Sequence, residues 1–131
     1  MKKWFFMVLI AGVLTACANQ PIYNVDNHSV PFSAQKLPLE KIEMVIIQAG
    51  QSRSWKFQRA GTGHLIATQV DPKFSATVDV YFTQQNYRII HNSTTGLKEQ
   101  NGTVHSHYNF WVRNLEHDIE TYLNNAGTLA N

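Results

Sequence analysis

The strongest constraint on the fold is a strict alternation of apolar and polar residues between positions 74 and 82. The apolar positions are Phe74, Ala76, Val78, Val80 and Phe82. A period of two is typical of a β-strand with one buried and one solvated face. Such strands belong to antiparallel sheets, because a parallel sheet buries both faces and its strands are apolar throughout. The sequence therefore predicts an antiparallel sheet that is covered on one side only.

Neighbouring segments predict three more strands and a preceding helix. Residues 55–58 alternate in the same way, and Gly61-Thr62-Gly63 is typical of a hairpin turn before a strand at 64–70. A further strand is expected at 87–91, followed by a polar loop at 93–102. Residues 39–49 carry apolar side chains at helical spacing, with Pro38 suited to the first turn and Gly50 to the end.

A second helix is predicted from about Tyr108 to Asn124, ended by Ala126-Gly127, and Trp111 is expected to fill the space between this helix and the sheet. Its apolar stripe comprises Tyr108, Trp111, Val112, Leu115, Ile119, Tyr122 and Leu123. The α-β-β-β-β-α order predicts an α+β fold, a four-stranded antiparallel meander with two helices packed on one face. The globular domain is expected at residues 37–125, with a C-terminal tail at 126–131.

The N-terminus predicts export and anchoring. Lys2 and Lys3 precede an uncharged apolar run over residues 4–14, which is shorter than the roughly 20 residues that a spanning helix needs. The following Leu14-Thr15-Ala16-Cys17 resembles the bacterial lipobox. We therefore predict a signal peptide at residues 1–16 and lipid attachment at Cys17. The alternative is an ordinary cleavage site beside a chance cysteine, but one unpaired thiol is unusual in an oxidising compartment.

The resemblance to bacterial lipoproteins carries further implications for the anchor. It implies a diacylglyceryl group and an N-acyl chain on Cys17, and several acyl chains hold a protein stably at a membrane. Retained inner-membrane lipoproteins typically carry Asp at the next position, whereas this chain has Ala18. The resemblance therefore implies a location at the outer membrane, facing the periplasm.

The segment after Cys17 and the overall charge bound the remaining possibilities. Residues 17–36 are rich in Asn, Asp, Ser and Pro without periodicity, so we expect a flexible tether.

The chain has eleven Lys and Arg and nine Asp and Glu, and removal of Lys2 and Lys3 with the signal leaves nine of each sign. A near-neutral domain with scattered cations is not expected to bind nucleic acid.

Five motifs resemble a family of small bacterial lipoproteins of unassigned function, over about residues 38–123. The most specific is the His-x-x-Tyr-Asn-x-Trp-Val-x-x-Leu run over residues 105–115. The others are Arg53-Ser54-Trp55, residues 63–68, Val78-Asp79-Val80-Tyr81 and Tyr87-Arg88-Ile89. Ser54 and Gly61 depart from the pattern at loop positions. The resemblance implies a compact α+β lipoprotein and says nothing about catalysis.

Two function hypotheses follow from the side chains. In the first, the uncovered sheet face or the loop at 93–104 binds an envelope protein or peptidoglycan, without a cofactor, catalytic residue or metal. Its candidate residues are Lys56, Arg59, Tyr81, Tyr87 and Arg88, which combine aromatic and basic character. In the alternative, His91, His105 and His107 converge on a metal ion and support hydrolysis in the envelope. The simpler interpretation of these histidines is capping and loop hydrogen bonds.

Overall fold

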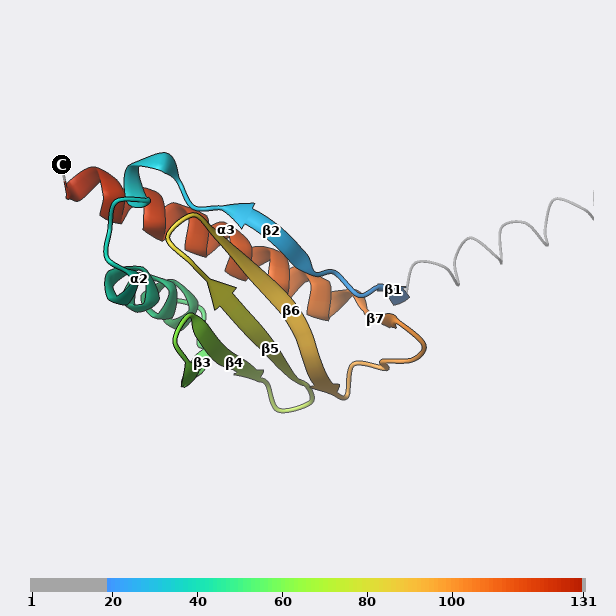
Figure 1. Ribbon diagram of the computed structural model, residues 1–131. Coiled ribbons are helices and arrows are strands. Elements are labelled where there is room, and N and C mark those ends of the chain that lie inside the picture. Colours follow the sequence, from blue (N-terminus) through green and yellow to red (C-terminus); the bar gives the residue numbers. More distant parts are fainter. Residues whose placement is uncertain (1–18, 131) are drawn as a thin grey trace, which may run out of the picture.

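The computed structural model describes residues 19–130 and has the predicted α+β architecture (Figure 1). The helices are α2 (Leu39–Gln51) and α3 (Ser106–Leu129), and a short 3-10 helix, η2, spans Phe32–Ala34. The strands are β1 (Asn19–Pro21), β2 (Val25–Ser29), β3 (Lys56–Gly61), β4 (His64–Val70), β5 (Ser75–Phe82), β6 (Asn86–Thr95) and β7 (Thr103–His105). The predicted antiparallel meander of four strands is present as β3 to β6.

The main sheet has five strands in the order β2-β6-β5-β4-β3, and all its neighbouring strands are antiparallel. The predicted hairpin between β3 and β4 turns at Gly63, whose φ of 71° suits glycine. A Cβ atom built on Gly63 would lie 2.8 Å from the carbonyl oxygen of Phe82. The turn therefore needs glycine both for its backbone conformation and for its close contact with the end of β5.

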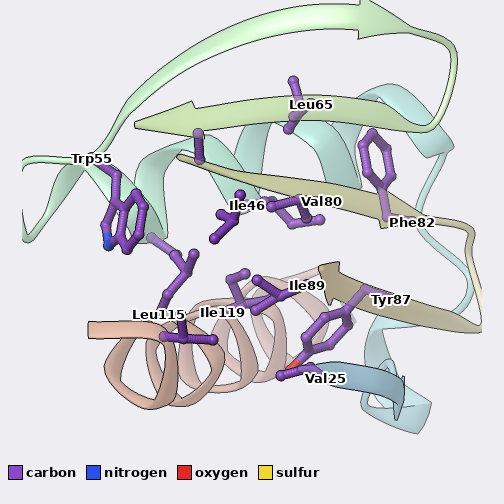
Figure 2. Close-up of a cluster of buried hydrophobic side chains, with 14 of the residues drawn as sticks. Val25, Ile46, Trp55, Leu65, Val80, Phe82, Tyr87, Ile89, Leu115 and Ile119 are labelled. Carbon is purple, nitrogen blue, oxygen red and sulfur yellow. The ribbon is translucent and has the colours of Figure 1, made fainter. Parts of the chain in front are cut away.

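The core lies between one face of the sheet and the two helices (Figure 2). Alternate residues of neighbouring strands point inward in register, as in the row Leu65, Val80 and Ile89. Ile46 from α2 and Leu115 from α3 meet this face from the helix side. The apolar residues of β5 therefore face the helices, and the polar residues between them lie on the open side of the sheet.

The prediction of a flexible tether is wrong for residues 19–36. This segment forms β1, which pairs with β7, and β2, which extends the main sheet beyond β6. Val25, Val30 and Ala34 are all buried. The buried apolar residues of this segment are few and unevenly spaced, because the pairing of β2 with β6 shifts register between Val25 and His28. The sequence of the segment therefore shows no regular period. The sheet consequently has one strand more than predicted.

The predicted C-terminal tail is also wrong, because α3 continues to Leu129. Gly127 does not end the helix but is buried against the chain at η2. A Cβ atom at Gly127 would lie 2.5 Å from the backbone carbonyl carbon of Ser33. The glycine therefore permits close approach of α3 and the N-terminal segment.

The two tryptophans of the described region differ in burial. Trp55, just before β3, is 2% exposed and is among the largest fully buried side chains. Trp111 is only partly buried at the edge of the core, and its ring meets that of His107 edge-on at 4.6 Å. The expectation that Trp111 fills the space between α3 and the sheet is wrong, because its ring is only partly buried, and Trp55 is the tryptophan inside the core.

Candidate functional site

The open face of the sheet carries a row of three aromatic and basic side chains from neighbouring strands. His64 on β4 and Arg88 on β6 are the register partners of Tyr81 on β5. The rings of His64 and Tyr81 stack with centroids 4.3 Å apart, and the guanidinium carbon of Arg88 lies 5.4 Å from the Tyr81 ring centroid. Tyr81 is therefore held on both sides by its cross-strand neighbours.

A second set of contacts on the same face orients His64. Its Nε2 lies 2.7 Å from Asp79 Oδ1, and the side-chain amide of Asn92 donates to Asp79 Oδ2 at 3.0 Å. Asn92 reaches this side of the sheet where the register of β5 and β6 shifts after Thr77. The arrangement presents fixed hydrogen-bonding groups on a solvated surface, which suits binding of a polar ligand.

The structure divides the five predicted binding residues between two faces. Lys56, Tyr81 and Arg88 are exposed, and Tyr81 and Arg88 lie together on the open face. Arg59 instead pairs in register with the buried Leu65, and its Nε lies 3.3 Å from the carboxylate of Glu43 on α2. Arg59 is therefore on the helix side of β3, and its assignment to the open face is wrong.

The assignment of Tyr87 to the binding surface is also wrong. Its side chain is fully buried beneath the sheet, and its hydroxyl donates to the backbone carbonyl of Glu116 at 3.3 Å. Burial and the nearby Glu120 and Glu116 carboxylates raise the pKa of Tyr87, because all three disfavour the phenolate. Adjacent strand residues point to opposite faces, so the neighbouring positions of Tyr87 and Arg88 already indicated that they do not share one.

A group of side chains that we call the N-terminal clasp joins the first residues of the domain to α3. We define it as Tyr23, His28 and Glu116. Glu116 accepts a hydrogen bond from the Tyr23 hydroxyl at 2.6 Å, and its other oxygen lies 2.7 Å from His28 Nδ1. The remaining ring nitrogen of His28 is 3.1 Å from a Glu120 oxygen, close enough for an ion pair but without hydrogen-bond geometry.

Further contacts tighten this attachment. The hydrogen bond to Glu116 raises the pKa of Tyr23, with burial adding to the effect, because the phenol must keep its proton to donate. The guanidinium of Arg113 lies 4.2 Å from the centroid of the Tyr23 ring. The buried Asn109 accepts from the backbone N–H of Tyr23 at 3.0 Å and donates to the carbonyl of Pro21 at 2.9 Å. Sequence patterns missed these contacts, since they join positions about 90 residues apart.

The pairing of β1 with β7 fixes the position of Asn19. Asn19 pairs with His105, whose Nδ1 accepts from the backbone N–H of His107 and caps α3. The start of β1 therefore lies at the N-terminal end of α3, at the opposite end of this helix from the C-terminus (Figure 1). The predicted signal peptide and Cys17 lie outside the described residues.

The three histidines of the alternative hypothesis do not converge. His91 Nε2 lies 2.7 Å from the carboxylate of Glu99, and His105 is occupied with the helix cap. The hydrogen bond from the Thr94 hydroxyl lowers the pKa of Glu99 most, burial opposes this shift, and the contact with His91 lowers the pKa further. Among residues 19–130, no three His, Cys, Asp or Glu side chains are grouped so that they could hold a metal ion.

Neither helix of the described region is both long and apolar enough to cross a bilayer. Comparison of the chain with protein-family models, with curated proteins and with solved structures found no match. The resemblance to small lipoproteins therefore rests on the sequence motifs alone.

Proposed function

We propose that this protein is a lipid-anchored binding module of the bacterial cell envelope, held at the periplasmic face of the outer membrane through Cys17. The observation that carries the proposal is the position of the only cysteine in the chain. It directly follows the apolar segment and small residues of a lipobox-like sequence and precedes the first strand by two residues. A thiol consumed by a thioether needs no disulfide partner, which agrees with its being single.

The anchor is tested by Cys17→Ser in cells given labelled palmitate, followed by membrane fractionation. The wild-type chain is expected to take up label and to sediment with membranes, whereas the variant should do neither. A matched control adds Ser29→Cys to the Cys17→Ser chain, which restores a thiol at an exposed position of β2. The control should stay unlabelled. Uptake of label by the Cys17→Ser chain contradicts lipidation at this residue.

The binding surface in this proposal is the open sheet face around Tyr81, Arg88 and Lys56. Arg88 beside the Tyr81 ring favours a ligand that carries a carboxylate and a flat or apolar group, and Lys56 adds a second exposed cation further along the same face. The peptide stems of peptidoglycan supply carboxylates, and so does an acidic segment of an envelope protein. The proposed activity is binding without catalysis, with Asp79 fixing the orientation of the His64 ring on this face.

Purified peptidoglycan sacculi provide the direct test of this surface. The full-length protein is mixed with sacculi in detergent and sedimented, and Arg88→Ala and Tyr81→Ala are each expected to reduce the bound fraction severalfold. Thr121→Ala, on the exposed side of α3, is the matched control and should bind like the wild type. In cells, a photo-crosslinking residue at position 88 should yield an adduct with peptidoglycan or one envelope protein that is absent when the residue is at 121. Equal behaviour of positions 88 and 121 in both assays contradicts the proposed surface.

A further inference from the structure

We infer that the end of the domain where β1, β7 and the first turns of α3 meet rests on the phospholipid surface, with the Phe110 side chain in the lipid interface. We call this region the anchor end. The inference rests on the proposed lipidation of Cys17 and deepens it, because it names the surface that faces the membrane.

The connection between Cys17 and the folded domain is short. Only Ala18 lies between Cys17 and Asn19, and even a fully extended chain spans no more than about 7 Å from Cys17 to Asn19. Asn19 is paired with His105, and paired strands lie about 5 Å apart. A lipidated Cys17 at the membrane surface therefore brings the start of α3 close to the headgroups.

Hydrogen bonds make this connection rigid. The side-chain amide of Asn109 donates to both Gln20 and Pro21, and the N-terminal clasp holds the chain that follows. Asn109 is 3% exposed, so water does not compete freely for these bonds. The anchor end is therefore fixed relative to the point at which the chain leaves the fold, and it cannot swing away on a long linker.

The exposed apolar residue at this end is Phe110. It is 60% exposed, although it stands beside the buried Asn109 in the first turns of α3. Phe110 also borders a shallow depression of about 400 Å³ together with Gln20 of β1. Leaving a phenylalanine in water is unfavourable, and its transfer to the lipid interface removes that apolar surface from water.

Neighbouring aromatic side chains have the same preference. Trp111 follows Phe110 in the chain and is partly buried, and the ring of His107 packs against it. The ring centroids of Phe74 and His107 lie 5.3 Å apart. Tryptophan and related amphipathic rings are enriched at the level of the headgroups.

The charge around the depression agrees with a phospholipid surface. Its lining contains no Asp or Glu, and Arg113 is its one permanently charged residue. Anionic headgroups attract such a surface, whereas carboxylates there would repel them.

A second exposed apolar region lies at the far end of α3 and does not fit this anchor. Leu129 is 85% exposed, but it lies about 28 Å along the helix from Phe110 at 1.5 Å per residue. The lipid on Cys17 brings only the anchor end within reach of its own membrane. Leu129 therefore serves as a distant reference position in the test.

Single-cysteine labelling in the full-length protein tests the inference, because lipid consumes the thiol of Cys17 and leaves an introduced cysteine as the only free one. Phe110→Cys, Thr121→Cys and Leu129→Cys are each labelled with an environment-sensitive fluorophore and reconstituted in vesicles of phosphatidylethanolamine and phosphatidylglycerol. Thr121 is the matched control, because eleven residues bring it back to the same side of α3 about 16 Å further from the anchor. Quenching by spin-labelled lipid is then measured.

The label at position 110 is expected to be quenched severalfold more strongly than the labels at 121 and 129. Lipidated protein in which position 110 is quenched no more than position 121 overturns this inference and leaves the proposed anchor intact. Stronger quenching at 129 also overturns it, since the opposite end then faces the membrane. Intact mass is measured before reconstitution, and a chain without lipid on Cys17 overturns the proposed function and this inference together.

Discussion

His28 of β2 holds its Nδ1 2.7 Å from the carboxylate of Glu116 on α3. Because the same carboxylate accepts the Tyr23 hydroxyl, one side chain on the last helix secures both ends of the strand that completes the sheet. Residues 19–36 are consequently part of the folded domain.

Glu116→Gln is expected to reduce the free energy of unfolding by about 1–3 kcal/mol, because a neutral amide replaces the charged acceptor of two hydrogen bonds. Urea denaturation measures the loss, and hydrogen exchange should show faster opening of residues 23–29. Asp26→Asn, which removes an exposed carboxylate of the same strand, is the control and should change little. If the two variants are equally stable, the clasp does not hold the strand.

Removal of residues 19–36 is expected to unfold the domain rather than to trim a linker. The truncation uncovers the core at Val25, Val30 and Ala34 and exposes the backbone of β6 as a new sheet edge. The loss of buried apolar surface and of one strand amounts to several kcal/mol, a large share of the roughly 5–15 kcal/mol that stabilises a domain. Circular dichroism of the truncated protein tests this prediction. A native spectrum with an unchanged melting temperature would show that residues 19–36 do not stabilise the domain.

Trp55→Ala should cost about 3–5 kcal/mol, because it leaves a large cavity in the core. Trp111→Ala should cost clearly less, since its partly exposed ring leaves a gap that water can enter. The two variants form a matched pair, and their unfolding free energies can be compared directly by chemical denaturation. A larger loss for Trp111→Ala contradicts the burial described for these residues.

At alkaline pH, the folded protein is expected to resist ionisation of three of its five tyrosines, Tyr23, Tyr87 and Tyr108. Burial raises the pKa of Tyr87 and of Tyr108 above the ordinary value of 10. A raised pKa stabilises the folded state at pH values below the unfolded pKa, and this contribution is lost as the pH rises above it. Phenolate absorbance should therefore increase in two steps, the second coinciding with loss of the circular dichroism signal. Ionisation of all five tyrosines while the circular dichroism signal stays native contradicts this prediction.

The sequence predicted the parts of the fold whose patterns are local. The alternation of β5 and the glycine turn before β4 were sufficient for the meander, because both depend on near neighbours in the chain. Strand β2 was missed, since Val25 is the only buried residue within the strand and its pairing with β6 is irregular. Its attachment depends on Glu116, which lies 88 residues from His28, and no local pattern encodes such a contact.

The candidate binding surface was predicted in part for a related reason. Tyr81 and Arg88 were placed correctly on the open face, because the period of β5 and the position of Arg88 between two inward residues determine their direction. Tyr87 and Arg59 were chosen for residue type, although the strand period places Tyr87 inside and the register with Leu65 places Arg59 beside α2. The stacking of His64 on Tyr81 depends on the register between strands, which the sequence does not show.

The lipid anchor at Cys17 is the central claim, and the mass of the mature N-terminus tests it most directly. Protein extracted from the membrane is digested with trypsin, and the mass of the N-terminal peptide that ends at Lys36 is measured. The account predicts a peptide that begins at Cys17 and carries the added mass of a diacylglyceryl group and one N-acyl chain. A peptide that retains residues before Cys17, or one with an unmodified Cys17, contradicts the account.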